Sequence, residues 1–295
     1  MEVTMTHVKL VPGAPTKCVS TCDSPLILGA GGWNIFHHCG VLKALEERGI
    51  KAGEVLGVSA GSMAAAFYTN GYTPDEMVQA FLKLADEREN FGQIIECFTM
   101  ADPLAMSVGG PISLKPLFKR LITDYGLEPN KRLKIVACDL FTHEPVVFKG
   151  TDYNLVDAMA ASGSVPGVYQ PVWHFDNGRA RLLVDGAIYH YSPTEFSDGP
   201  CIVSKFRPAT QPPREWKTPV DLYFHFRELV FPLAGNHRYV DEEKHLVIET
   251  GLPYVAALNN GLSKETMLLM VENGREIAGQ LLDKAREEGR FCNAS

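Results

Sequence analysis

Hydrophobic and polar positions near the N-terminus alternate between short apolar runs and helical patterns. Residues 24–28 form an apolar run that leads into the glycine-rich segment 29–32, which predicts a buried strand followed by a turn. Residues 39–48 then place apolar side chains at helical spacing. A second short strand over 53–58 precedes small residues and helix formers that continue to Gly71. This repeated order of strand, turn and helix predicts a parallel α/β sheet.

The rest of the chain contains further periodic segments. Thr73, Pro74 and Glu76 have the spacing of a capping box, so we expect a helix from there to about residue 88. The other expected helices cover 113–125, 155–161 and 264–290. The other expected strands cover 132–138, 145–149, 181–184, 201–204 and 220–226.

The pattern divides the chain into a leader and one domain. Residues 1–23 are irregular, and no linker or repeat splits residues 24–295, whose core motifs lie at about 25–195. An insertion at about 88–130 contains an apolar, aperiodic stretch, which is either core or a lid that meets lipid. The helix at about 264–290 has mixed charges and is expected to bury one apolar stripe, formed by Met267, Met270, Val271 and Leu281, with partner binding as the alternative.

Composition and charge exclude several classes of protein. The chain has 295 residues, 45% hydrophobic and 21% charged, which is typical of globular proteins. The formal net charge is -7 and basic residues form no run, so we expect no nucleic-acid partner. The absence of a polybasic cluster means that any transient membrane-surface contact would be apolar and local.

The sequence also bears on cofactors and location. Seven scattered cysteines argue against a disulfide framework, and they lack the spacing of a zinc site, so we expect no metal and no cofactor. The N-terminus lacks the pattern of a signal peptide, and no window of about 20 residues is continuously apolar. We therefore expect a cytoplasmic protein, with peripheral membrane contact left open.

The pentapeptide Gly57-Val58-Ser59-Ala60-Gly61 lies between an expected strand and an expected helix. In that context G-x-S-x-G is typical of a nucleophile elbow, in which a sharp turn lifts the serine hydroxyl clear of the sheet. Glycines at both ends remove Cβ atoms that would clash in the turn, and the helix N-terminus favours negative charge beside the serine. The alternative is a structural turn whose serine caps the helix.

Two further motifs accompany the pentapeptide. Gly29-Ala30-Gly31-Gly32, also between a strand and a helix, can aim backbone N–H groups at an oxyanion or at a phosphate. A nucleotide loop is disfavoured because neither the Walker A pattern nor the full dinucleotide fingerprint is present. Asp185-Gly186 ends an expected strand, where a carboxylate in a parallel sheet faces the ligand edge, although Asp-Gly is also a common turn.

Together these motifs resemble the patatin-like phospholipase family, particularly its bacterial-type members. The resemblance extends to the blocks CGVLKALEERGI, EVLGVSAGSMAAAFYTNGYTPDEM, VACDLFTHEPVVF, DAMAASGSVPGVYQPV and LLVDGAIYHYSPT, in family order. It implies a three-layer α/β/α fold with a mostly parallel central sheet. It also implies a Ser-Asp dyad without a catalytic histidine, and a lipid or lysolipid ester as substrate. Oligomeric state is not implied.

Carried over residue by residue, the resemblance assigns Ser59 as nucleophile and Asp185 as base, in an elbow bounded by Gly57 and Gly61. Gly31 and Gly32 become the oxyanion donors, assisted by the N–H of Ala60, the residue after the nucleophile. The expected activity is that of a phospholipase A or lysophospholipase acting through an acyl-enzyme.

The sequence departs from the family pattern in the oxyanion loop. The family usually has a basic residue and then glycine where this chain has Asn34 and Ile35, and Ala187 replaces the commonest glycine after Asp185-Gly186. Two alternatives therefore stay open. One is a catalytically impaired binding or regulatory module. The other is an esterase with a Ser-His-Asp triad, whose histidine would be one of those after Asp185, namely His190, His225, His237 and His245.

Overall fold

The structure is a computed structural model, and its description covers most of the chain. The described residues are 19–20, 24–88, 110–176, 178–207, 240–252 and 262–292. The strand expected at 220–226 lies outside these residues, as do residues 89–109 of the expected insertion and most of the leader. The division into a leader and one domain therefore stays a prediction.

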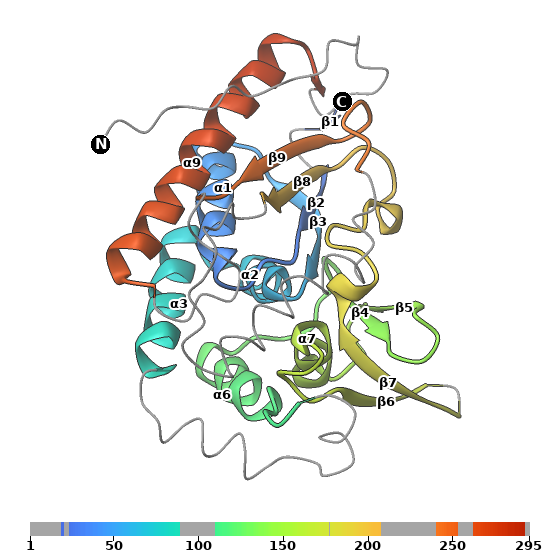
Figure 1. The fold of residues 1–295 in the computed structure, drawn as a ribbon. Coiled ribbons are helices and arrows are strands. Elements are labelled where there is room, and N and C mark those ends of the chain that lie inside the picture. The colour runs from blue at the N-terminus through green and yellow to red at the C-terminus, as the bar shows by residue number, and fades with distance from the viewer. Residues whose placement is uncertain are drawn as a thin grey trace, which may run out of the picture.

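A mixed eight-stranded sheet forms the centre of the described structure (Figure 1). Its strand order is β6-β7-β4-β3-β2-β8-β9, with β5 paired to β4. Strands β4, β3, β2, β8 and β9 are mutually parallel, whereas β5 and β7 run antiparallel to β4. The strands are β2 Ser24–Leu28, β3 Ala52–Val58, β4 Leu133–Asp139, β5 Pro145–Lys149, β6 Val172–Asp176, β7 Arg179–Asp185, β8 Ile202–Phe206 and β9 Leu246–Thr250.

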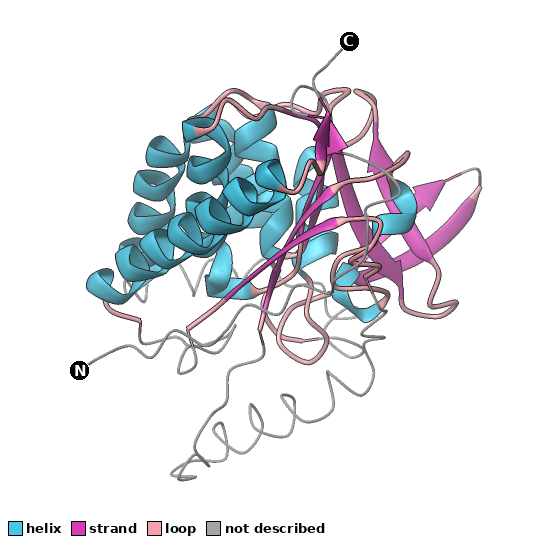
Figure 2. Cartoon of the chain, turned by 90° about the horizontal axis from the view of Figure 1, so that it is seen from above, coloured by secondary structure: helices cyan, strands magenta, loops and turns pink. Residues whose placement is uncertain are grey.

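The described α-helices gather on one face of this sheet (Figure 2). They are α1 Ile35–Glu47, α2 Ala60–Thr69, α3 Pro74–Arg88, α6 Lys115–Tyr125, α7 Leu155–Gly163 and α9 Lys264–Glu287. Successive residues of β2 point to opposite faces, as the two-residue period of a strand requires. Leu26 and Leu28 join the core beneath the helices, and Ile27 joins a smaller core on the other face. The predicted α/β class with a mostly parallel sheet is confirmed.

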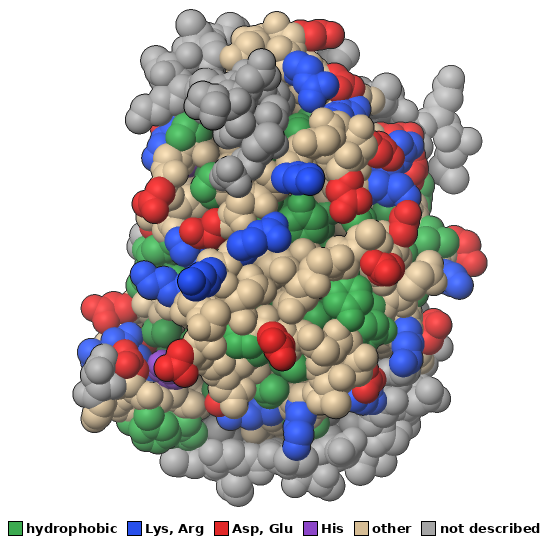
Figure 3. All heavy atoms as spheres, turned by 180° about the vertical axis from the view of Figure 1, so that it is seen from behind, with side chains coloured by type: hydrophobic (Ala, Val, Ile, Leu, Met, Phe, Trp, Pro, Cys, Tyr) green, Lys and Arg blue, Asp and Glu red, His purple; other side chains and the backbone are tan. Residues whose placement is uncertain are grey.

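The smaller core is covered in the described residues by two short 3-10 helices, η2 Gly186–Ile188 and η3 Thr194–Phe196. Ala187 and Phe196 pack there against the sheet. Over the face drawn in Figure 3, acidic and basic side chains are interspersed, and neither sign gathers into one patch. Within the described residues, no helix is both long enough and apolar enough to cross a bilayer.

Strands β3 and β7 end beside adjacent residues of β4. Val58, the last residue of β3, pairs with Val136, and Asp185, the last residue of β7, pairs with Ala137. Since β3 runs parallel to β4 and β7 runs antiparallel to it, their C-terminal ends point toward each other. The expectation that Asp185 ends a parallel strand is wrong, but the antiparallel direction brings Asp185 to the residue that follows Val58.

Local sequence signals predicted most element positions within a few residues. The capping box forms as expected: the Thr73 N–H donates to Glu76 Oε2 at 2.8 Å, and the Glu76 N–H donates to Thr73 Oγ1 at 3.3 Å. The stripe predicted on α9 is buried in the main core. The sequence analysis did not predict strands β6 and β9. The last two residues of β6 are exposed, and β9 alternates buried and half-buried residues.

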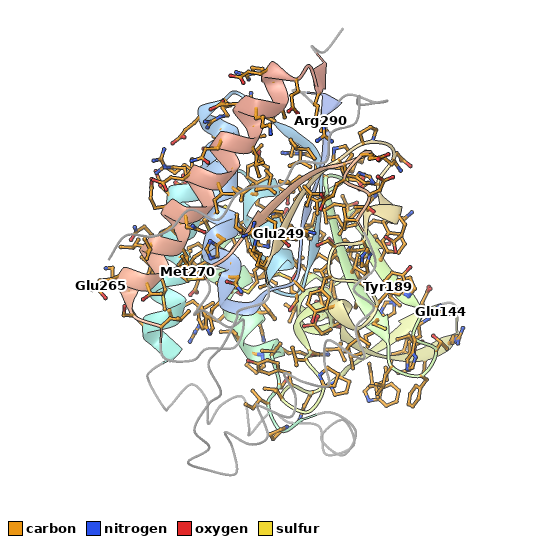
Figure 4. The ribbon with its side chains drawn as sticks, turned by 45° about the horizontal axis from the view of Figure 1, so that its top comes forward. Glu144, Tyr189, Glu249, Glu265, Met270 and Arg290 are labelled. Carbon is orange, nitrogen blue, oxygen red and sulfur yellow. The ribbon has the colours of Figure 1, made fainter. Side chains whose placement is uncertain are left out.

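Helices α1 and α9 pack at unusually close range through two glycines. A Cβ atom on Gly40 would lie 2.0 Å from Val271 O, and one on Gly274 would lie 2.4 Å from His37 O. Both obstacles are backbone atoms, which cannot move aside without shifting a helix. Along α9, Met270 lies on the inner side and Glu265 on the outer side (Figure 4).

We predict that Gly274→Ala destabilises the protein by about 2–3 kcal/mol, the usual cost of overpacking a tight contact. Gly279→Ala on the same helix is the matched control, because its Cβ would meet only the flexible end of Arg48, at 2.7 Å. There we expect little loss, since alanine favours helix over glycine by about 1 kcal/mol. Urea unfolding measures the free energy of unfolding of both variants, and an equal loss in Gly274→Ala and Gly279→Ala would contradict the proposed contact.

Candidate active site

Ser59 sits in a strained turn between β3 and α2. Its backbone has φ 53° and ψ -123°, a combination that non-glycine residues rarely adopt. Glycines make the turn possible: a Cβ on Gly57 would lie 2.4 Å from Ser62 Cα, and one on Gly61 would lie 2.0 Å from Leu28 O. The local geometry is therefore a strained strand-to-helix turn, the shape that a nucleophile elbow requires.

The Ser59 hydroxyl is hydrogen-bonded to the carboxylate of Asp185. Ser59 Oγ donates to Asp185 Oδ2 at 2.7 Å, and the Ala187 N–H donates to Oδ1 at 2.9 Å. Asp185 is only 1% exposed, so its carboxylate is largely removed from solvent. Ala187, which departs from the commonest family residue, thus contributes a backbone donor that orients Asp185.

The glycine-rich loop lies against the start of α2. A Cβ on Gly61 would lie 2.8 Å from Gly29 O. Two backbone bonds fix the loop: the Gly29 N–H donates to Ser204 O at 2.9 Å, and the Ala30 N–H donates to Tyr191 O at 3.0 Å. Within the described part of the chain, the N–H groups of the three predicted oxyanion donors make no hydrogen bond; these donors are Gly31, Gly32 and Ala60.

A buried histidine supports this loop from behind. His38 is fully buried in α1, with Nε2 2.8 Å from Gly29 O and Nδ1 2.8 Å from Ser204 Oγ. A carbonyl can only accept, so Nε2 carries the proton and the neutral Nδ1 accepts from the Ser204 hydroxyl. Burial lowers the pKa of His38 to about 4, which keeps this neutral form at pH 7.

Phe206, the last residue of β8, fills the space beside the loop. Its ring centroid lies 4.4 Å from that of His38, and a Cβ on Gly31 would lie 2.1 Å from the Phe206 ring. Gly31 is therefore required by packing, because any side chain there would displace the ring. Sequence reasoning missed Phe206, since its partners lie more than 160 positions away in the chain.

The two residues that depart from the family pattern are both buried. Asn34 is 5% exposed at the end of η1 (Gly32–Asn34), and Ile35 is 3% exposed at the start of α1. Ile35 belongs to the main core. This segment thus packs in the interior, and the glycine-rich loop before it carries no charged side chain.

The other histidines that follow Asp185 make contacts elsewhere. His190 Nδ1 lies 3.2 Å from Glu195 Oε2, and His245 Nδ1 lies 2.9 Å from Cys201 Sγ. Although burial alone raises the pKa of Glu195, hydrogen bonds that include one from His190 hold it at about 2. His225 and His237 lie outside the described residues. The only described partner of the Ser59 hydroxyl is thus Asp185.

A family model described as patatin-like phospholipase matches residues 26–196. The match covers more than half of the chain, and this chain belongs to the patatin-like phospholipase family. The fold and the family blocks noted in the sequence agree with this assignment. In the described residues, His, Cys, Asp and Glu side chains form no group of three that could hold a metal ion.

Several solved structures are similar to this chain at low identity. VipD from Legionella pneumophila is 16% identical with a TM-score of 0.49, and the match covers 95% of this chain and 72% of VipD. The type III effector ExoU is 16% identical with a TM-score of 0.43, covering 90% of this chain and 54% of ExoU. The matching chain of the ExoU–SpcU complex of Pseudomonas aeruginosa is 17% identical with a TM-score of 0.43, and the match covers 91% of this chain and 52% of that chain. This chain thus spans about half the length of ExoU.

We predict that stability falls as the pH drops from 7 to 5, because of two buried histidines. Burial lowers the pKa of His37 to about 3, with a further contribution from His38, whose own pKa is about 4. Both folded pKa values lie below the unfolded value of about 6.5, so below pH 6.5 the unfolded chain binds protons that the folded chain does not. The contribution of the two neutral histidines to stability is therefore complete above pH 6.5 and is lost as the pH falls toward 4.

By pH 5 the loss amounts to about 2 kcal/mol for each fully buried histidine. Urea unfolding at both pH values measures this loss. His38→Gln should remove about half of the pH dependence while conserving a donor for Gly29 O. An unchanged pH dependence in this variant would contradict the assignment to His38.

Proposed function

We propose that this chain hydrolyses the carboxylic esters of lipids, as a phospholipase A or lysophospholipase, through an acyl-enzyme on Ser59. The observation that carries the proposal is the 2.7 Å hydrogen bond from Ser59 Oγ to a buried carboxylate, in an elbow with positive φ. A turn that only caps α2 requires no such partner, and the Ser59 side chain makes no cap hydrogen bond to that helix.

In the first half of the proposed reaction, Ser59 Oγ attacks the acyl carbonyl carbon and Asp185 accepts its proton. The N–H groups of Gly31, Gly32 and Ala60 stabilise the negative charge on the carbonyl oxygen. The tetrahedral intermediate collapses with loss of the alcohol, which takes the proton from Asp185. This leaves an acyl ester on Ser59 Oγ.

In the second half, Asp185 accepts a proton from water, and the resulting hydroxide attacks the acyl-enzyme. Collapse releases the fatty acid and returns the proton to Ser59 Oγ. A carboxylate is a weaker base than imidazole near neutral pH, so this dyad suits esters, whose leaving groups are better than those of amides. No cofactor or metal takes part in these steps.

We predict that Ser59→Ala and Asp185→Asn each lower ester hydrolysis by about a thousandfold or more, as loss of a catalytic group does elsewhere. Asp139→Asn is the matched control. Asp139 is also a buried aspartate at a strand end, but its Oδ1 accepts from the Phe141 N–H at 3.0 Å, a role that asparagine can take over.

The assay uses soluble p-nitrophenyl esters and mixed phospholipid vesicles, together with fluorophosphonate labelling of Ser59. Full activity in Asp185→Asn would remove Asp185 as the base. A wild type that neither hydrolyses esters nor reacts with the fluorophosphonate would favour the binding-module alternative instead.

Two exposed phenylalanines support transient contact with a lipid surface. Phe141 is 69% exposed and Phe175 is 74% exposed. The first follows β4 and the second lies near the tip of the β6–β7 hairpin, where it pairs with Ala180. Counted from the pair Ala137–Asp185, the pair Phe175–Ala180 lies about 17 Å further along β7, on the side of the sheet where β3 ends. Phe141 lies on the same side, in the turn after β4.

Local charge does not oppose such contact. The two hairpins carry four basic residues and four acidic residues, which are Lys134, Lys149, Arg179 and Arg181 against Asp139, Glu144, Asp176 and Asp185. We therefore include Phe141 and Phe175 in this proposal as two exposed apolar side chains on hairpins without net charge. We include in this proposal a cytoplasmic location with peripheral contact to a membrane. The lid expected within 88–130 stays a prediction.

We predict that replacing Phe141 and Phe175 together by Asp weakens binding to phosphatidylcholine vesicles by about tenfold per residue, since burying a phenylalanine contributes about 1.5–3 kcal/mol. Leu268 and Leu269 on α9 are 43% and 49% exposed, and the control variant replaces both of them by Asp. Cosedimentation measures both. Equal binding by the two variants would refute contact through the hairpins, and hydrolysis of a soluble ester should change in neither.

A further inference from the structure

Ser162, near the C-terminal end of α7, contacts the backbone of the candidate nucleophile. Its side chain is fully buried, and its Oγ accepts a hydrogen bond from the Ser59 N–H at 2.8 Å. The same Oγ donates its proton to Val136 O at 2.7 Å. A hydroxyl has one proton and two lone pairs, so both bonds form together and leave no freedom in the position of the oxygen.

The contact with Val136 places Ser162 where the two catalytic strands meet. Val136 pairs with Val58, the residue before Ser59, and its neighbour Ala137 pairs with Asp185. Two residues beyond Ser162, the carbonyl of Ser164 accepts the Asp185 N–H at 2.9 Å. The end of α7 therefore holds the backbones of both Ser59 and Asp185.

The strained elbow makes this contact important for the position of Ser59 Oγ. A backbone at φ 53° and ψ -123° persists only where its surroundings fix it. The Ser59 N–H precedes the first turn of α2 and has no acceptor within that helix. Ser162 Oγ supplies the acceptor instead. A rotation about the Ser59 backbone would move Oγ away from Asp185.

We propose that Ser162 is a positioning residue, which fixes the Ser59 backbone so that its hydroxyl stays in line with Asp185. The proposal rests on the hydrolysis proposed above. Ser162 touches neither the substrate nor the Ser59 hydroxyl, and it acts through the N–H of Ser59 alone. Its effect should therefore appear in the rate of the chemical steps and not in substrate binding.

The first experiment compares Ser162→Ala with Ser162→Thr on a soluble p-nitrophenyl ester. Alanine removes the acceptor, and we expect kcat to fall about 10- to 100-fold, the scale of misplacing a reacting group by up to about 1 Å. KM should stay within about twofold. Threonine keeps the hydroxyl and should restore kcat to within about threefold of wild type.

A matched control separates positioning from general stability. Thr69, at the far end of α2, donates its hydroxyl to Ala65 O at 2.8 Å and contacts neither Ser59 nor Asp185. Thr69→Val removes a hydroxyl from the contacts of the same helix, so it reports how far lost stability alone lowers activity. Thermal unfolding of all three variants shows whether each is folded at the assay temperature. We expect Thr69→Val to keep the wild-type kcat.

A second readout does not depend on catalysis. In an NMR spectrum, the amide proton of Ser59 should shift upfield in Ser162→Ala, because it loses its hydrogen bond, and should stay in place in Ser162→Thr and Thr69→Val. A wild-type kcat and an unmoved Ser59 amide in Ser162→Ala would overturn the proposal. If wild type and Ser59→Ala are equally inactive, the proposed hydrolysis fails, and the amide shift still decides whether Ser162 holds the elbow.

Discussion

The site depends on one backbone constraint, the left-handed turn at Ser59. A non-glycine residue in this region costs about 1–3 kcal/mol, so the turn needs compensating contacts. They come from three directions: backbone packing that only Gly57 and Gly61 allow, the Ser62 hydroxyl on Ser59 O at 2.6 Å, and Ser162 on the Ser59 N–H. These contacts hold the hydroxyl out toward Asp185 instead of back toward α2.

The approach of Asp185 follows from strand direction rather than from sequence proximity. Because β7 runs antiparallel to β4, its last residue pairs with Ala137, next to the partner of Val58. The C-terminal ends of β3 and β7 therefore approach each other from opposite directions. The approach of Asp185 to Ser59 is thus a property of the sheet, and the sheet is stabilised by the large core beneath α1, α2, α7 and α9.

The features that the sequence predicted depend on neighbouring residues, whereas the features that it missed join residues far apart in the chain. The elbow, the glycine loop, the capping box and the α9 stripe all have local signals: turn residues, caps and helical periodicity. The direction of β7, the contact of Ser162 with Ser59 and the support of Gly29 by His38 join residues that no local pattern connects. Ser162 lies in a block that resembled the family, yet the block alone did not indicate which atom its hydroxyl binds.

The departures at Asn34 and Ile35 are best understood through burial. A basic side chain at position 34, where the present residue is 5% exposed, would place a charge largely out of water, which is costly without a partner. The chain instead fixes its loop with neutral bonds: Gly29 to Ser204, Ala30 to Tyr191, and His38 to Gly29.

In the proposed reaction, backbone N–H groups held in this way are oriented before charge develops, and orientation of this kind supplies most of the benefit of an oxyanion hole. The N-terminus of α2 adds its partial positive charge at the same place. Under this proposal, Asn34 in place of the family's basic residue removes one charge from the loop and leaves the backbone donors of the proposed oxyanion hole in place.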